Sequence, residues 1–120
     1  LIGIAHELKF RDNMFDVIVS TETLEHDMYY EKSLQNIIRL LKNNGLLLLT
    51  WNNESYAEHG TLQYKPHNSL TTQLNNVKWQ NYYKGLHEDE IFQIINPDNI
   101  FSIHKFWRAT GCSTFYGVKK

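Results

Sequence analysis

Three polar side chains follow a short apolar run near the start of the sequence. The run Phe15–Val19 is rich in β-branched and aromatic residues and too short for a helix, which is typical of a parallel strand covered on both faces. Ser20, Thr21 and Glu22 come directly after it. Ligands of open α/β sheets bind beyond the carboxyl ends of the strands, so these side chains are candidate ligand-binding groups. The alternative is that Ser20 and Thr21 cap a turn and Glu22 faces solvent.

The next segments predict a strand–helix–strand unit around these residues. Residues 30–42 carry apolar side chains at the spacing of one helical face, namely Leu34, Ile37, Ile38 and Leu41. Asp27 is a suitable N-cap, and Asn43-Asn44-Gly45 is a stop signal because these residues tolerate left-handed backbone. Residues 46–49 then predict a second buried strand, and a right-handed crossover would make the two strands parallel.

The rest of the chain completes a single α/β domain. Residues 52–85 show no lasting periodicity but contain several aromatic residues, which favours a long functional loop or lid over plain disorder. Residues 86–95 predict a short helix. Residues 100–107 and 114–118 predict an antiparallel pair of strands at the end of the sheet, linked by a turn around Gly111.

The composition excludes several classes of protein. The 120 residues carry 12 basic and 13 acidic side chains, so the net charge of −1 gives no general reason to bind nucleic acid or an anionic membrane. No apolar run approaches the length of a membrane span. The single cysteine, Cys112, cannot form an internal disulfide, and no Cys/His spacing matches a zinc site, so we expect no metal and a cytoplasmic location.

Several stretches, taken in order, resemble one enzyme family. They are Ala5–Phe10, Phe15–Val19, Thr23–His26 and Leu41–Thr50. Their order and spacing are similar to those of the Rossmann-like methyltransferases that use S-adenosylmethionine, of the type 11 class, and the similarity covers about the first fifty residues. The resemblance implies a partial Rossmann-like sheet of parallel strands that ends in an antiparallel pair.

The resemblance also implies where the cofactor S-adenosylmethionine binds. Ala5 and His6 would lie against the adenine, and Ser20, Thr21 and Glu22 would line the methionine end, with His26 nearby. Two positions depart from the family pattern. Ile4 stands where an acidic residue usually contacts the adenine amino group, and Asn43-Asn44 replaces the usual Pro-Gly.

Methyl transfer to a hydroxyl acceptor benefits from a general base. The candidates are His26 and His59, with Glu54 and Glu58 behind them. For His26 the alternative is a structural role at the helix start, and for His59 that of a loop residue without a role. The aromatic residues that could form an acceptor wall are Trp51, Tyr56, Trp79, Tyr82 and Tyr83, some of which could instead pin the long segment to the sheet.

The glycine-rich loop of the family is missing from this sequence. Its six glycines never form a Gly-x-Gly cluster, and residues 1–5 would be only the end of the third strand. We therefore expect residues 1–120 to be the C-terminal part of one methyltransferase domain, acting on a small-molecule or sugar acceptor. The run Phe15–Val19 would then be an exposed edge strand, which predicts a homodimer or pairing with a missing N-terminal half. The alternative is a degenerate or truncated domain that serves as a non-catalytic binding or assembly module.

Overall fold

The computed structural model describes residues 3–120. Its strands are β1 (Phe15–Thr21), β2 (Leu41–Asn52), β3 (Phe101–Arg108) and β4 (Cys112–Lys119). Its helices are α1 (Tyr30–Leu40), α2 (Val77–Gln80), α3 (Glu88–Ile95) and α4 (Pro97–Ile100). Short 3₁₀ turns lie at Ala5–Glu7, Leu24–His26, Pro66–Asn68 and Leu70–Gln73.

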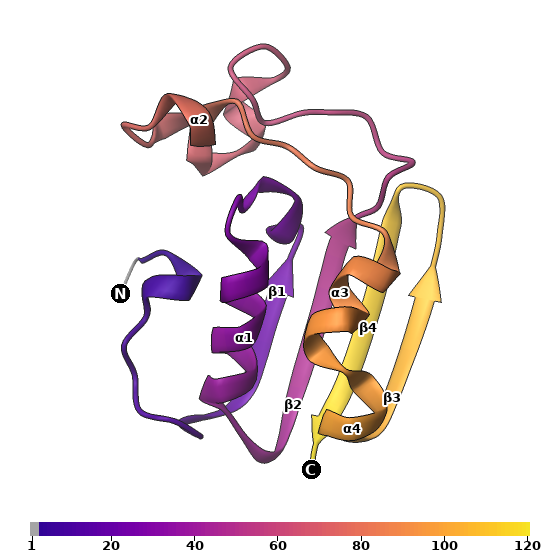
Figure 1. Cartoon of the computed structure of the whole chain (residues 1–120). Helices are drawn as coiled ribbons and strands as arrows, with labels where there is room; N and C mark the ends of the chain where they lie inside the picture. The colour runs from indigo at the N-terminus through magenta and orange to yellow at the C-terminus, as the bar shows by residue number, and fades with distance from the viewer. Residues whose placement is uncertain (1–2) are drawn as a thin grey trace.

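The four strands form one mixed sheet in the order β1-β2-β4-β3 (Figure 1). β1 and β2 are parallel, as the strand–helix–strand pattern predicted. β4 is inserted antiparallel between β2 and β3, which confirms the α/β fold with a terminal antiparallel pair.

Helices α1 and α3 cover one face of the sheet (Figure 1). The core between the helices and the sheet consists of apolar side chains that are nearly inaccessible to solvent, among them Leu34, Leu47, Leu49, Trp51, Ile91, Ile95 and Phe115. On the other face, apolar side chains of three strands remain exposed within the described residues, namely Val17, Val19, Leu46, Ile103 and Trp107. β1 is also an edge strand, as expected. One face of the sheet is therefore covered by helices, and the other face exposes apolar side chains to solvent; we call it the open face.

Several element boundaries differ from the predicted ones. Residues 1–5 were predicted to be the end of a strand. Leu1 and Ile2 lie outside the described residues, and the prediction is wrong for Gly3–Ala5, which contains no strand. α1 ends at Leu40 because β2 begins immediately at Leu41. Asn44 does adopt left-handed backbone, with φ of 63°, but it does so inside β2, next to an irregularity in the pairing with β1.

The start of α1 is organised differently from the expectation that Asp27 is its N-cap. The N-cap position is Tyr29, whose amide donates a 2.8 Å hydrogen bond to the Asp27 carboxylate. The same carboxylate accepts a hydrogen bond from the Ser33 hydroxyl in the first turns of the helix. Asp27 thus stabilises the helix start from outside the cap position.

The segment between β2 and α3, residues 53–87, passes over the carboxyl ends of β1 and β2 (Figure 1). We call it the arch. It holds α2 and two of the 3₁₀ turns, so it is less irregular than the sequence indicated. Its position puts the arch directly above the residues that follow β1.

Candidate functional site

A cavity of about 620 Å³ lies beyond the carboxyl end of β1. Its walls are Gly3–Ala5, four residues of the turn after β1, and six residues of the arch between Asn68 and Trp79. Its volume is within the range of small-molecule sites, about 300–1,000 Å³. We call it the strand-end pocket, and its place matches the expected ligand position in an open α/β sheet.

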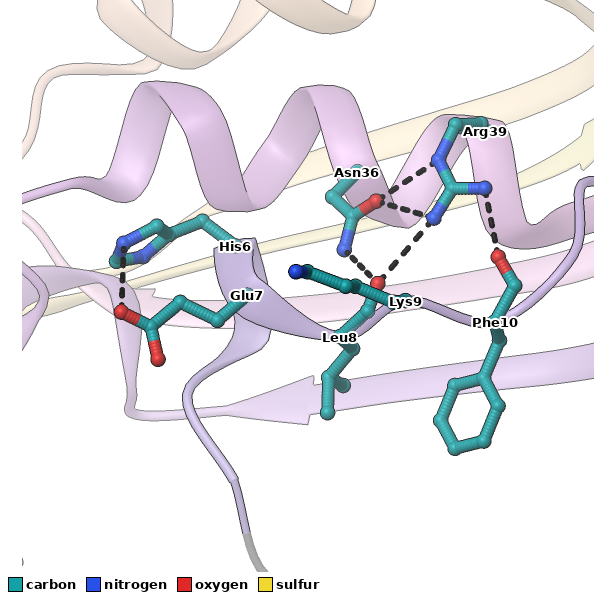
Figure 2. Close-up of a pocket in the computed structure, with 7 residues that line it drawn as sticks. All are labelled: His6, Glu7, Leu8, Lys9, Phe10, Asn36 and Arg39. Atoms are coloured by element: carbon teal, nitrogen blue, oxygen red, sulfur yellow. Dashed lines mark hydrogen bonds and ion pairs between the residues drawn. The ribbon is translucent and has the colours of Figure 1, made fainter.

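A second hollow, of about 750 Å³, lies between the N-terminal segment and α1 (Figure 2). There the Asn36 amide donates hydrogen bonds of 2.7 and 3.1 Å to the carbonyls of Ala5 and Leu8. The Arg39 guanidinium donates to the carbonyls of Leu8 and Phe10. These bonds use the main chain of the segment, so the two side chains of α1 fix its path along the helix. They thereby hold Ala5 at the wall of the strand-end pocket.

Of the two residues predicted to lie against the adenine, the pocket contains one. Ala5 lines the strand-end pocket, whereas His6 lines the hollow beside α1 (Figure 2). The His6 ring packs against Tyr29 and Trp79, with centroid distances of 4.7 and 6.3 Å. This contact gives His6 a packing role between the N-terminal segment and the arch.

The three polar residues after the first apolar run also have different positions. Glu22 lines the pocket; its backbone is left-handed, with φ of 48°, and its amide donates a 2.9 Å hydrogen bond to the Thr50 carbonyl at the end of β2. Its carboxylate accepts a 3.4 Å contact from the Cys112 thiol. Ser20 and Thr21 are not among the pocket residues, and the Thr21 carbonyl accepts a hydrogen bond from Thr23 in the turn.

The structure brings the two candidate bases together. His26 lies in the 3₁₀ turn Leu24–His26 and His59 in the arch, yet their ring centroids are 4.8 Å apart. Gly60, with φ of 63°, makes this approach feasible, since a Cβ there would lie 2.7 Å from Cε1 of His26. The Trp79 indole donates a 2.9 Å hydrogen bond to the His26 carbonyl and ties α2 to the same turn. His26 is buried and also lines the pocket.

Glu25, next to His26, is a site residue that the sequence analysis did not single out. Its side chain is completely buried, and burial raises its pKa to about 7, with a smaller contribution from the Glu22 charge, although the backbone of Glu25 and Asn52 partly offsets the rise. Burial, and then the nearby His59, lowers the pKa of His26 to about 4. The Glu25 carboxylate and the His26 ring are 3.9 Å apart, which would favour a charged pair. Because burial is the larger effect on both, we expect a neutral His26 ring and a Glu25 carboxyl that is about half ionised near pH 7. The signal in the sequence was an acidic residue held between Leu24 and a histidine.

Of the aromatic residues proposed as an acceptor wall, Trp51 lies in the core and not at the strand-end pocket. It is fully buried in β2, and its indole donates a hydrogen bond to the Leu86 carbonyl, so it belongs to the core below α3. Trp79 both lines the pocket and pins the arch. The rings of Tyr56 and Tyr83 lie 5.1 and 5.0 Å from the His59 ring.

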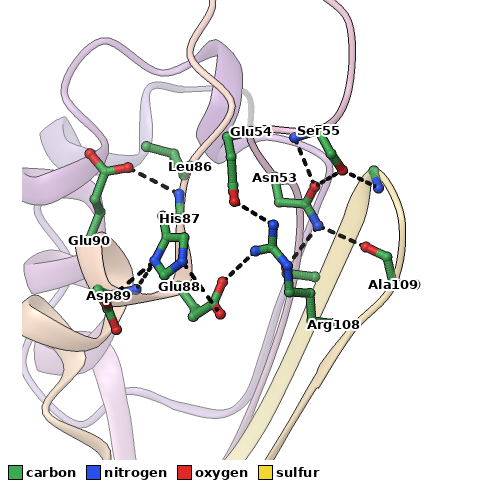
Figure 3. Close-up of polar contacts among 12 residues, drawn as sticks. Asn53, Glu54, Ser55, Leu86, His87, Glu88, Asp89, Glu90, Arg108 and Ala109 are labelled. Atoms are coloured by element: carbon green, nitrogen blue, oxygen red, sulfur yellow. Dashed lines mark hydrogen bonds and ion pairs between the residues drawn. The ribbon is translucent and has the colours of Figure 1, made fainter.

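A separate polar network joins β2, α3 and the β3–β4 hairpin (Figure 3). The buried Asn53 amide donates to the Ala109 carbonyl and the Ser113 hydroxyl, and its oxygen accepts from Ser55. The Arg108 guanidinium pairs with Glu54 and Glu88. Hydrogen bonding from Arg108 lowers the pKa of Glu54, so this carboxylate is engaged at the hairpin and not behind a candidate base. The network fixes the base of the arch.

Comparison with known proteins gives a consistent result. Residues 1–49 match the model of the family described as methyltransferase domain. The chain has no match among curated protein sequences. In the part that the structure describes, every helix is too short or too polar to span a bilayer.

Solved structures of methyltransferases share the fold. A methyltransferase from Thermotoga maritima that depends on S-adenosylmethionine is 17% identical, with a TM-score of 0.65 over 100% of this chain and 63% of that one. For the phosphoethanolamine N-methyltransferase 2 of Haemonchus contortus, the identity is 18% and the TM-score 0.65, over 97% of this chain and 36% of the other. The 1,6-didemethyltoxoflavin N1-methyltransferase of Burkholderia thailandensis is 16% identical, with a TM-score of 0.59 over 97% of this chain and 48% of that one.

The chain therefore spans less than two thirds of the length of these structures. Its first 49 residues are similar to the methyltransferase-domain family, and the chain as a whole shares its Rossmann-like fold with part of these S-adenosylmethionine-dependent methyltransferase structures.

Proposed function

We propose that this chain is part of a longer methyltransferase that transfers a methyl group from S-adenosylmethionine to a small-molecule or glycan-type acceptor. The observation that carries the proposal is the strand-end pocket, which joins Ala5, Glu22 and His26 at the carboxyl end of β1. These are residues that the resemblance assigns to the cofactor and to catalysis. The Haemonchus contortus structure contains phosphomonomethylethanolamine and that from Burkholderia thailandensis contains 1,6-didemethyltoxoflavin, which supports an acceptor of similar size.

The residues of the pocket fit such a cofactor in part. Gly3–Ala5 offers a wall of small and apolar side chains, suited to a flat adenine ring. Ile4 makes this contact apolar instead of a hydrogen bond to the adenine amino group. Glu22 also lines the pocket and offers a carboxylate, as the resemblance implies for the methionine end. Asp27 is already engaged by Tyr29 and Ser33, so Glu22 is the better candidate for a polar contact.

When bound, S-adenosylmethionine supplies a methyl group that is already activated on a sulfonium centre. The protein then has to hold the acceptor in line and exclude water. His26, whose pKa is about 4, is neutral at pH 7 and can accept a hydrogen bond from an acceptor group in the pocket. The arch, with Leu70 and Trp79 in the pocket wall, would cover the reacting groups.

A cytoplasmic location and a small acceptor are parts of the same proposal. The location is inferred from the single cysteine, Cys112, since disulfides are common in secreted proteins. The Trp79 indole and the hydroxyl groups of Ser69 and Thr71 in the pocket lining support a glycan-type or smaller acceptor.

Calorimetric titration of the chain with S-adenosylhomocysteine, the product of methyl transfer, tests the proposal. We expect one site per chain, weakened about tenfold by Glu22→Gln, since one charge-assisted hydrogen bond is lost. Glu7→Gln is the matched control, because Glu7 lines the hollow beside α1 (Figure 2) and should leave the affinity unchanged. A folded chain that binds no S-adenosylhomocysteine would favour the alternative of a non-catalytic binding or assembly module.

A further inference from the structure

Glu25, His26 and His59 form a cluster of ligand atoms at the junction of the turn after β1 and the arch. One ligand atom from each residue lies within 4.8 Å of the others. Two of the side chains come from the 3₁₀ turn Leu24–His26 and the third from the arch, so the cluster exists only in the folded chain. Two imidazoles and one carboxylate are a common donor set for divalent transition metals.

The polar atoms of this cluster lack other partners. Neither carboxylate oxygen of Glu25 nor Nδ1 of His26 makes a hydrogen bond of normal geometry in the part of the chain that the structure describes, although backbone groups of Glu25 and Asn52 lie near the carboxylate. The exposed fractions of these two side chains are 0% and 7%. Buried polar groups are nearly always satisfied, and an unpaired buried carboxylate is especially costly. A cation bound at the Glu25 carboxylate would satisfy its two oxygens.

The geometry is close to that of a bound ion. Nε2 of His26 lies 3.9 Å from Oε1 of Glu25. Zinc binds such atoms at about 2.0–2.2 Å, which places tetrahedral ligands about 3.3–3.6 Å apart, so the ligand atoms need to approach one another by up to about 1.5 Å. Nδ1 of His59 lies 3.0 Å from the Ala57 carbonyl. If Nδ1 carries the proton, this contact orients the ring and leaves Nε2 free for a metal, as is usual for histidine ligands.

We propose that Glu25, His26 and His59 bind one divalent transition-metal ion of the zinc type. Mixed imidazole and carboxylate donors suit zinc better than magnesium or calcium, which prefer oxygen ligands. The ion would fix the arch to the turn that follows β1. Three protein ligands leave a fourth position for water or for an acceptor oxygen. The site does not depend on methyl transfer and requires no cofactor.

Metal titrations of the chelator-treated chain test this proposal. We expect calorimetry with Zn²⁺ to give one saturable site per chain. Co²⁺ should give the intense visible absorption of a tetrahedral site. His59→Ala should weaken Zn²⁺ binding more than about 100-fold, because loss of a ligand exceeds the effect of losing an outer-shell partner. His67→Ala is the matched control, since His67 is an exposed histidine of the same arch and should leave the affinity unchanged.

Glu25→Gln provides a second variant that keeps the shape of the side chain and removes its charge. It should also lose most of the Zn²⁺ affinity, whereas the far-UV circular dichroism spectrum should be that of the parent chain. Absence of saturable binding to the parent chain would overturn the proposal. Equal affinity of the parent chain and both ligand variants would overturn it as well, because binding would then occur elsewhere.

Discussion

The imidazole rings of His26 and His59 lie with their centroids 4.8 Å apart and their planes at 85°, although the two residues precede and follow β2. The contact joins the turn after β1 to the arch above it. Trp79 adds a second attachment through its hydrogen bond to the His26 carbonyl. The arch is therefore held against the strand-end pocket by residues that themselves belong to the candidate site.

Gly60 is expected to be essential for this contact. A Cβ at residue 60 would lie 2.6 Å from Cβ of Ser69 and 2.7 Å from the His26 ring, and φ is +63°. Gly60→Ala should lower the free energy of unfolding by about 1–3 kcal/mol, as measured by urea denaturation. Gly3→Ala is the control, since its Cβ would meet only the end of the Leu8 side chain. Equal stability of both variants would contradict the packing described for the arch.

The pH dependence of stability should expose the buried pair Glu25 and His26. The pKa of Glu25 is raised to about 7, so its contribution to stability is present at low pH and is lost as the pH rises from about 4.5 to 7. The pKa of His26 is lowered to about 4, so its contribution is lost as the pH falls from about 6.5 to 4. Over most of this window the two effects oppose each other.

Glu25→Gln separates the two effects. Relative to the parent chain, the variant should gain about 3 kcal/mol in the free energy of unfolding between pH 4.5 and 8, because only the parent must ionise a buried carboxyl. Urea denaturation of both chains at a series of pH values, with chelator present, measures this difference. A difference that stays constant with pH would show that Glu25 titrates normally.

The fold was largely predictable because local patterns of apolar residues specify most of its strands and helices. The apolar run of β1 and the helical stripe at Leu34 and Ile37 specify their elements through periodicity alone. The prediction that Trp51 belongs to the acceptor wall was wrong because β2 continues to Asn52. The alternation of side chains along the strand turns the indole toward α3. A predicted strand of residues 46–49 was too short to include it.

The candidate site was less predictable because it depends on tertiary contacts. His26 and His59 were each identifiable as histidines near strand ends, but their proximity depends on the path of the arch and on Gly60. The place of Glu25 between Leu24 and His26 gives no indication by itself that the carboxylate is buried. His6 and Ala5 are adjacent in the chain yet line different cavities, and Asn36 holds the Ala5 carbonyl between them while Arg39 holds the Leu8 carbonyl further along.

The open face of the sheet predicts self-association of the isolated chain. Val17 and Val19 on edge strand β1 are 54% and 56% exposed. Exposed apolar edges favour pairing with another strand. Sedimentation should therefore show concentration-dependent dimers, and Val19→Lys should shift the chain to monomer. Val77→Lys, at an exposed position of α2, is the control. A monomeric parent chain with a sharp cooperative melt would contradict this expectation.

Asn53 should be the residue on which the β3–β4 hairpin depends most. It is fully buried, and its side chain bonds to Ser55, Ala109 and Ser113 (Figure 3). Asn53→Ala should cost about 2–3 kcal/mol in thermal or urea unfolding, since it leaves buried partners unsatisfied. Asn81→Ala removes one exposed hydrogen bond and should cost far less. Similar losses in both variants would mean that the network adds little stability.

Amide NMR during titration with S-adenosylhomocysteine shows where on the chain the cofactor product binds. If it binds in the strand-end pocket, we expect saturable shift changes concentrated at Ala5, Glu22 and Leu70, which line the pocket, with little change at Lys9 in the hollow beside α1. Changes centred on Lys9 and Arg39, or none in a folded chain, would contradict binding in that pocket.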